Sequence, residues 1–203
     1  MKRKLKIEIG LAVLLLLIAL FGSFLAPYDP LKVNYDFSLQ PPSFLHIFGT
    51  DKLGRDVFSR ILCGAKTSFG LTFLMLFLIV FIGMIVGLIA GLSNDKVESF
   101  FNNIINGLLA FPDTIFAIAI VGIVGAGLFN TVFALALIWW TKYARLTLAL
   151  VKQEKKKNYL VISKMSGVPP LQRIIRYLLP NILSQILVTA FLDIGNMMIS
   201  LAG

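Results

Sequence analysis

The residues best suited to chemistry form one polar row in the last apolar segment of the chain. Their spacing of three and four residues places them on one face of a helix. A carboxylate facing lipid costs about 2.5–3.5 kcal/mol on insertion scales, so Asp193 must face water or protein. The row therefore lines a pathway for a polar solute, or it forms interhelical hydrogen bonds of about 0.6 kcal/mol each. Its members are Gln185, Thr189, Asp193, Asn196 and Ser200.

The surroundings of Asp193 favour the pathway over packing. No basic residue of the apolar segments is expected at matching depth to neutralise it. Met197 lies beside the row and is a further candidate for the pathway wall, although methionine is more often an adaptable packing residue. His46 and Cys63 are the only residues of their types, so no metal site and no internal disulfide are predicted.

Composition places the chain in a membrane. Of its 203 residues 58% are hydrophobic and only 14% are charged, and the mean hydropathy is +0.87. A soluble domain does not need so much apolar surface. The expected class is an all-α integral membrane protein, a polytopic helical bundle in the plasma membrane.

The net charge of +9 is explained by orientation rather than by nucleic acid. Four of the 19 Lys and Arg lie in residues 2–6, and nine lie in residues 142–176. Such clustering follows the positive-inside rule and predicts a cytoplasmic N-terminus. No module that combines basic and stacking aromatic residues is present, so no nucleic-acid partner is expected.

Five spans are predicted. Residues 1–26 form a cytoplasmic N-terminus and the first span, residues 27–66 an extracytoplasmic loop, and residues 67–203 a transmembrane core. The second span covers residues 71–92, where Gly83, Gly87 and Gly91 leave one face open to close helix packing. The third covers residues 100–123 and is broken at Pro112. The fourth covers residues 128–151, with Lys142 and Arg145 reaching toward cytoplasmic headgroups. The fifth starts at Pro180.

Residues 152–179 form a basic cytoplasmic loop with its own amphipathic pattern. Leu171, Ile174, Ile175 and Leu178 fall on one stripe of a helix. Pro169 and Pro170 suit the first turn of that helix, and Gly167 suits the end of the helix before it. Two short helices joined by a tight bend are expected, and they would form a compact protrusion that a partner protein binds. The alternative is a basic helix resting on lipid headgroups.

The extracytoplasmic loop contains a structured run from His46 to Arg60. Gly49 and Gly54 suit tight turns, and Thr50 or Asp51 is expected to cap a short helix. The opposite charges of the run are expected to pair locally.

These two segments resemble the permease subunits of ABC importers for peptides and nickel. The run Gly-Thr-Asp-Lys-Leu-Gly-Arg-Asp-Val-Phe-Ser-Arg at residues 49–60 is similar to one that lies beside the docked binding protein in that family. Residues 158–180 keep the spacing of its coupling loop, although Val161-Ile162-Ser163 stands where the family has Glu-Ala-Ala. Leu192-Asp-Ile-Gly-Asn-Met-Met198 is similar to the nickel branch, with Asn196 in place of its histidine.

The resemblance implies a permease that forms half of a translocation pathway, for nickel or a metal chelate, or alternatively for oligopeptides or dipeptides. It implies a sixth span in full-length relatives. The implied partners are a second homologous permease, two ATP-binding subunits, an extracytoplasmic binding protein and membrane lipid. The coupling residues it implies are Val161, Ile162, Ser163, Gly167, Leu171, Ile174, Ile175, Leu179 and Pro180.

The chain is not expected to be an enzyme. It lacks a Gly-x4-Gly-Lys-Ser/Thr phosphate loop, so ATP and Mg are expected on partner ATPase subunits and no cofactor on this chain. Two other classes stay open on the residues alone. One is a proton-coupled secondary transporter that uses Asp193 or Asp113, for which no internal repeat is found. The other is a membrane scaffold.

Overall fold

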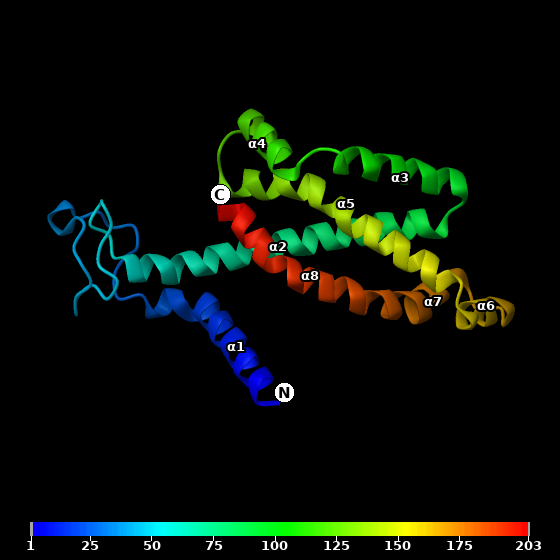
Figure 1. Cartoon of the computed structure of the whole chain (residues 1–203), viewed down its shortest axis with the longest axis horizontal. Helices are drawn as coiled ribbons and strands as arrows, with labels where there is room; N and C mark the ends of the chain where they lie inside the picture. Colours follow the sequence, from blue (N-terminus) through cyan, green and yellow to red (C-terminus); the bar gives the residue numbers. More distant parts are fainter. Residues whose placement is uncertain (1, 203) are drawn as a thin grey trace. The chain divides into compact units, whose positions relative to one another are not determined.

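The computed structural model describes residues 2–202, which are almost entirely helical. The chain divides into two compact units, Met1–Gly70 and Leu71–Gly203, and the long helix α2 (Val57–Leu92) contributes to both. Figure 1 labels the elements along the chain. Among the described residues, four helices are long and apolar enough to cross a membrane, and a bent helix pair can supply a fifth crossing.

The first unit contains the helix α1 (Lys2–Leu25), a loop and the start of α2. The loop holds one 3-10 turn, η1 (Tyr35–Phe37), and an isolated antiparallel bridge between Thr50 and Asp56. The predicted loop reaches residue 66, but α2 begins at Val57. At 1.5 Å per residue its 36 residues extend about 54 Å, which exceeds the roughly 30 Å bilayer core. The helix α2 is therefore longer than one crossing of the bilayer core requires.

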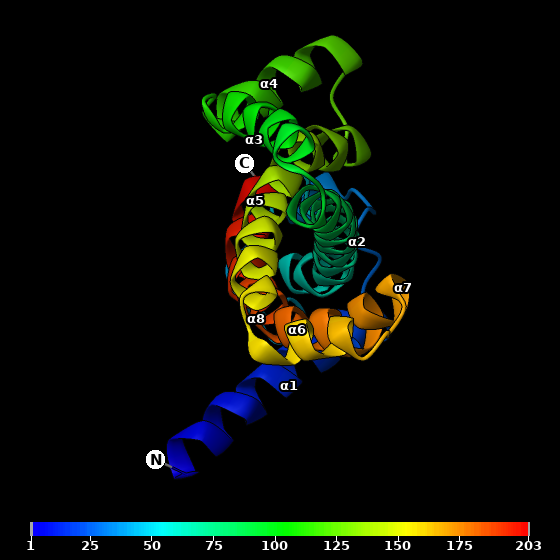
Figure 2. The same ribbon diagram turned by 90° about the vertical axis from the view of Figure 1, so that its right-hand side faces the viewer.

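In the second unit, α5 (Leu128–Lys155) is the central helix. It contacts α3 (Asp95–Leu109), α4 (Asp113–Val124) and α8 (Leu179–Ala202). Figure 2 shows α5 between the α3–α4 pair and the other helices. The core around it contains Met75 and Ile79 from α2 and Tyr143 from α5, all of them fully buried. Helices that are apolar on most faces, such as α2 and α5, are buried by neighbouring helices.

The glycine row of α2 packs against α5 as predicted. A Cβ at Gly83 would lie 2.6 Å from Trp140 O, and one at Gly87 would lie 2.5 Å from Thr147 Cβ. Real Cβ atoms do not approach so closely, so these positions require glycine. Because residue numbers rise together along both helices at this contact, α2 and α5 run parallel.

Parallel packing has a consequence for the segment between the two helices. Since α2 and α5 cross the membrane in the same direction, the chain between them must return across it. The only helices in that segment are α3 and α4, which meet at a bend of 82°. The predicted break of the third span at Pro112 is therefore a sharp corner, and α3 and α4 together make one crossing.

Candidate functional site

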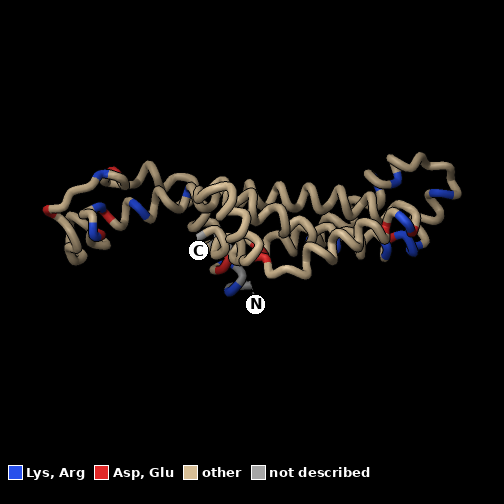
Figure 3. Tube along the Cα trace, turned by 90° about the horizontal axis from the view of Figure 1, so that it is seen from above, with Lys and Arg blue, Asp and Glu red and all other residues tan. Residues whose placement is uncertain are grey.

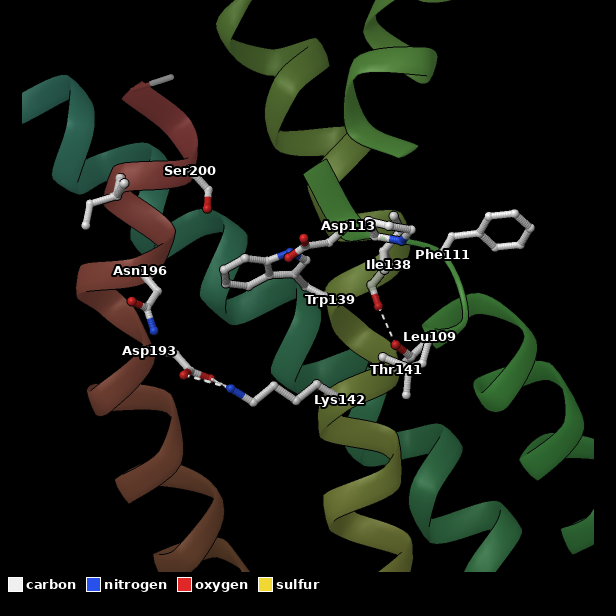
Figure 4. A pocket seen from close by; sticks show the side chains of 12 residues that line it. Leu109, Phe111, Asp113, Ile138, Trp139, Thr141, Lys142, Asp193, Asn196 and Ser200 are labelled. Carbon is white, nitrogen blue, oxygen red and sulfur yellow. Dashed lines mark hydrogen bonds and ion pairs between the residues drawn. The ribbon is translucent and has the colours of Figure 1, made fainter. Parts of the chain in front are cut away.

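Asp193 is held between two neighbouring residues of α5. Lys142 Nζ lies 2.8 Å and 2.7 Å from its two carboxylate oxygens, and the Tyr143 hydroxyl donates to Oδ2 over 2.9 Å. The carboxylate side chain is 8% exposed, whereas that of Lys142 is 50% exposed. Figure 4 shows the lysine extending from α5 to α8. A buried carboxylate that accepts three hydrogen bonds from two donor groups is compensated for the loss of water.

This pair corrects two of the sequence expectations. Asp193 has a basic partner at its own depth, and Lys142 reaches across to α8 instead of toward the headgroups. A sequence signal for the pair exists. Lys142 lies 25 residues before Gly167 and Asp193 lies 26 residues after it, so an antiparallel hairpin centred on that glycine brings them together.

The pair lies in a pocket of about 580 Å³. Its walls come from the α3–α4 corner, from α5 and from α8, as Figure 4 shows. Of the predicted row, Asp193, Asn196 and Ser200 line this pocket. Gln185 and Thr189 lie outside it, and the Thr189 hydroxyl donates to the Gln185 carbonyl over 3.0 Å. The polar row is therefore split between a pocket wall and the rest of α8.

Three further features complete the pocket. Asp113 at the start of α4 lines it, and its carboxylate accepts from the Thr114 N–H over 2.8 Å. Trp139 also lines it, and its Nε1 is buried without a hydrogen-bond partner among the described residues. Met197 does not line the pocket and is fully buried in the core.

The pocket offers hydrogen bonds and an ion pair rather than a metal cage. Among the described residues, no three His, Cys, Asp or Glu side chains come close enough together to hold a metal ion. The buried carboxylate of the pocket, that of Asp193, is already paired with the Lys142 ammonium group. The surface suits a polar solute that carries its own charges or hydrogen-bonding groups.

The loop after α5 contains the predicted tight bend. The helix α6 (Asn158–Met165) is followed by a bend at Gly167, whose φ is +71°. The Val168 N–H donates to Ser163 O over 3.1 Å, and the Gly167 N–H donates to Lys164 O over 3.2 Å. These two bonds form a Schellman motif, which requires a left-handed residue that glycine supplies most easily.

The second helix of the loop is longer than predicted. It starts as α7 (Pro170–Arg173), passes through a π-helical stretch (Ile174–Leu178) and continues without a break into α8. Pro180 was expected to start the span but lies inside this helix. Proline has no N–H and clashes with the carbonyl four residues earlier. The π stretch adapts to this, since the Leu179 N–H donates to Ile174 O, five residues back.

The predicted coupling residues divide into an exposed and a buried group. Val161, Ile162, Leu171 and Ile175 are 47%, 60%, 68% and 54% exposed. Ser163 is buried, and its hydroxyl donates to Leu160 O over 2.8 Å. Ile174 and Leu179 are partly buried against the core, and Pro180 is exposed. The exposed apolar group is the part that a partner protein can contact.

Glu154 fixes the corner between α5 and α6. The Lys157 ammonium lies 2.6 Å from Glu154 Oε1, and the Tyr159 hydroxyl donates to Oε2. Partial burial and the bond to this carboxylate raise the pKa of Tyr159 to about 12. The hydroxyl therefore keeps its proton, and the corner its hydrogen bond, at physiological pH.

The run from His46 to Arg60 has the turns that the sequence predicts. Gly49 and Gly54 have φ values of +71° and +70°, and a Cβ at Gly54 would lie 1.6 Å from Asn34 O. Asp51 pairs with Arg55 and Arg60. Partial burial alone would raise the pKa of Asp51, but hydrogen bonds from Arg55 and from the Leu53 N–H outweigh it and hold that pKa below its ordinary value.

The helix cap in this run was predicted at the wrong residue. Asp56, not Thr50 or Asp51, caps α2, since its Oδ2 accepts from the Ser59 N–H over 2.7 Å. His46 Nδ1 lies 2.9 Å from the other carboxylate oxygen. Thr50 instead bridges to Asp56 through the backbone. Asp51 instead accepts from the N–H groups of Leu53 and Arg55.

The chain combines parallel and antiparallel spans around a polar pocket with a basic loop between α5 and α8 that has an apolar tip. This combination is that of a multi-pass transport subunit. The family of binding-protein-dependent transport system inner membrane components matches residues 83–203. The N-terminal TM domain of oligopeptide transport permease C matches residues 9–42. The chain belongs to this family and is a permease of an ABC importer of the peptide and nickel group.

Named relatives divide between two substrates. The nickel transport system permease protein NikC of Escherichia coli (strain K12) is 33% identical over 190 residues, which cover 94% of this chain and 69% of the relative. The di/tripeptide transport system permease protein DppC of Pseudomonas aeruginosa (strain UCBPP-PA14) is 37% identical over 201 residues, 95% of this chain and 66% of the relative. The dipeptide transport system permease protein DppC of Haemophilus influenzae is 32% identical over 202 residues, 96% of this chain and 68% of the relative.

Proposed function

We propose that this permease forms half of a translocation pathway whose wall is the pocket between α3–α4, α5 and α8. The observation that carries the proposal is the Lys142–Asp193 pair at its centre. Charged groups inside a span are costly and mark solute pathways when they face a cavity. Here the Asp193 carboxylate is buried and the Lys142 ammonium is half exposed, so the pair adds polarity to the pocket wall without adding net charge.

The loop from Gln153 to Leu179 couples this pathway to ATP hydrolysis on two partner subunits. Support comes from the apolar side chains of Val161, Ile162 and Leu171, which are 47%, 60% and 68% exposed. The loop joins α5 directly to α8, and these two helices carry Lys142 and Asp193. A displacement of the loop by closing ATPases therefore reaches both walls of the pocket. A second permease supplies the other half of the pathway, and an extracytoplasmic binding protein delivers the solute.

For the solute we propose nickel bound in a chelate. The NikC relative and the Asp-Ile-Gly-Asn-Met-Met run from Asp193 to Met198 support it. Of the two carboxylates that line the pocket, Asp193 is already paired with lysine, and no three potential metal ligands come together among the described residues, which does not suit a bare divalent cation. A chelate brings its own ligands and presents polar groups to Asn196 and Ser200. A short peptide is the second candidate, supported by the two DppC relatives.

Uptake by the complete importer tests the proposal. Cells that lack other nickel and peptide importers would receive the whole system and labelled nickel, nickel with excess histidine, or a labelled dipeptide. We expect uptake of the nickel–histidine complex and a large loss with Asp193→Leu, while Asp193→Asn retains more activity. Ser184→Leu on the same helix, outside the pocket, is the control. Equal uptake by Asp193→Leu and the parent would show that the pocket is not part of the pathway. Uptake of the dipeptide alone would show that the solute is a short peptide and not a nickel chelate.

A further inference from the structure

A second cavity, outside the proposed pathway, lies where the span helices α2 and α5 end. Its volume is about 590 Å³, and its walls come from α2, α5, α6, α7 and the π stretch. We call it the basic groove because Lys155, Lys164 and Arg173 line it. Figure 3 shows Lys and Arg gathered in this part of the chain.

The three cations of the basic groove converge from three separate helices. Lys155 is the last residue of α5, Lys164 lies near the end of α6, and Arg173 lies at the end of α7. No acidic side chain is among the residues that line the groove. None of the ion pairs formed by the described residues involves these three. Lys155 Nζ is held 3.0 Å from Gly91 O, at the end of α2. The groove therefore presents an uncompensated positive charge.

The rest of the groove is apolar and begins at membrane depth. Leu92, which ends the α2 span, lines it together with Leu160, Ile174 and Leu178. A ligand that fits must combine a negative head with an aliphatic part. Arginine binds phosphate oxygens through two parallel N–H groups, and lysine adds a point charge.

We propose that the basic groove binds an anionic phospholipid of the cytoplasmic leaflet, with its phosphate between Lys164 and Arg173 and an acyl chain along Leu92 and Leu178. Basic pockets between helices on the cytoplasmic side attract such headgroups. The position of the groove follows from the orientation set by the basic loop. The bound lipid would connect the end of α2 to α6 and α7, and so steady the loop that carries the coupling residues.

A lipid fits the groove better than the ATPase does. The apolar side chains most exposed on the loop are Met165, Leu171 and Ile162, at 82%, 68% and 60%. None of these three lines the groove. The most exposed apolar side chains of the loop therefore lie outside the groove, and of the predicted coupling residues only Val161 and Ile174 line it.

Native mass spectrometry of the full permease with its partners tests the proposal. The complex would be exchanged into phosphatidylcholine with limiting phosphatidylglycerol, and retained lipid would be counted. We expect a phosphatidylglycerol adduct that Lys164→Gln with Arg173→Gln reduces at least threefold. The matched control is Lys156→Gln with Arg176→Gln, which removes the same charge from the same loop outside the groove. The conservative pair Lys164→Arg with Arg173→Lys should retain the adduct and thereby show that the fold is intact.

Several outcomes would overturn the lipid assignment. Equal loss of the phosphatidylglycerol adduct in the groove and control variants would show that the total charge of the loop, and not the groove, retains the lipid. Equal retention of phosphatidylcholine and phosphatidylglycerol would remove the headgroup selectivity. Displacement of the adduct by inorganic phosphate would make the groove a free-anion site. Normal lipid retention with loss of ATPase co-purification in the groove variant would assign the groove to the partner protein. None of these outcomes depends on which solute the importer carries.

Discussion

At the scale of single residues, the contact that matters most is the clamp of Lys142 and Tyr143 on Asp193. Both donors come from consecutive positions of α5, one half exposed in the pocket and the other fully buried. Together they give each oxygen of this buried carboxylate a hydrogen-bond donor inside a helical bundle. The clamp is therefore a fixed link between α5 and α8, and in the proposed function it is also a polar wall of the pathway.

A charge exchange tests this clamp. Lys142→Met leaves a buried carboxylate without its cation, and we expect a loss of about 1–3 kcal/mol in stability together with lower uptake. Lys142→Asp combined with Asp193→Lys restores an ion pair at the same place and should recover part of both. Thermal stability in detergent and uptake by the complete importer are the measurements. If the double variant were no better than the sum of its single changes, the two residues would not interact.

At the scale of elements, the hairpin formed by α5, α6 and α7–α8 connects the loop to the pocket. Its bend depends on one left-handed residue, Gly167, and on the Schellman bonds around it. Its second arm bypasses Pro180 through a π stretch rather than breaking there. A continuous helix transmits a displacement along its axis better than two helices joined by a flexible break, so the observed arm is stiffer than the sequence suggests.

Gly167→Val tests the bend. No heavy atom lies within 4 Å of a Cβ built at this position, so a substitution there is resisted by its positive φ and not by a clash. A β-branched residue in that conformation costs about 1–2 kcal/mol, and we expect weaker association with the ATPases and lower uptake. Gly167→Asn is the control because asparagine tolerates a left-handed backbone. Co-purification with the ATPases measures the effect, and normal association of the valine variant would contradict it.

At the scale of the whole molecule, the parallel packing of α2 and α5 determines how the chain crosses the membrane. It requires α3 and α4 to return the chain, and α8 then crosses in the opposite direction to α5. The basic residues near the end of α5 and on α6 and α7 lie together on one side of these crossings. The positive-inside rule predicts that this side is the cytoplasm.

Thiol labelling of intact cells tests this topology. With Cys63→Ser as background, a cysteine at the exposed Asn158 is expected to be shielded from an impermeant reagent. A cysteine at the exposed Ser38 is expected to react, since the loop that contains it carries balanced charge. The opposite result at both positions would invert the molecule and move the coupling loop away from the ATPases.

By itself the sequence determined what depends on local patterns. Hydropathy defines the spans, basic clusters predict the sidedness, and the left-handed conformations of Gly49, Gly54 and Gly167 follow from turn chemistry and are confirmed. The glycine row of α2 likewise predicted a close helix contact, because a missing side chain leaves room only for a neighbour. Each of these features is set by residues near one another along the chain.

Only the tertiary structure decided which distant residues meet. It paired Lys142 with Asp193, left Gln185 and Thr189 outside the pocket, and buried Met197 in the core. It also moved the cap of α2 to Asp56 and continued the last helix through Pro180. A periodic row shows that side chains share a face but not what covers each turn of it. The covering side chains come from other helices, and their depth and rotation are fixed by packing between helices rather than by local sequence.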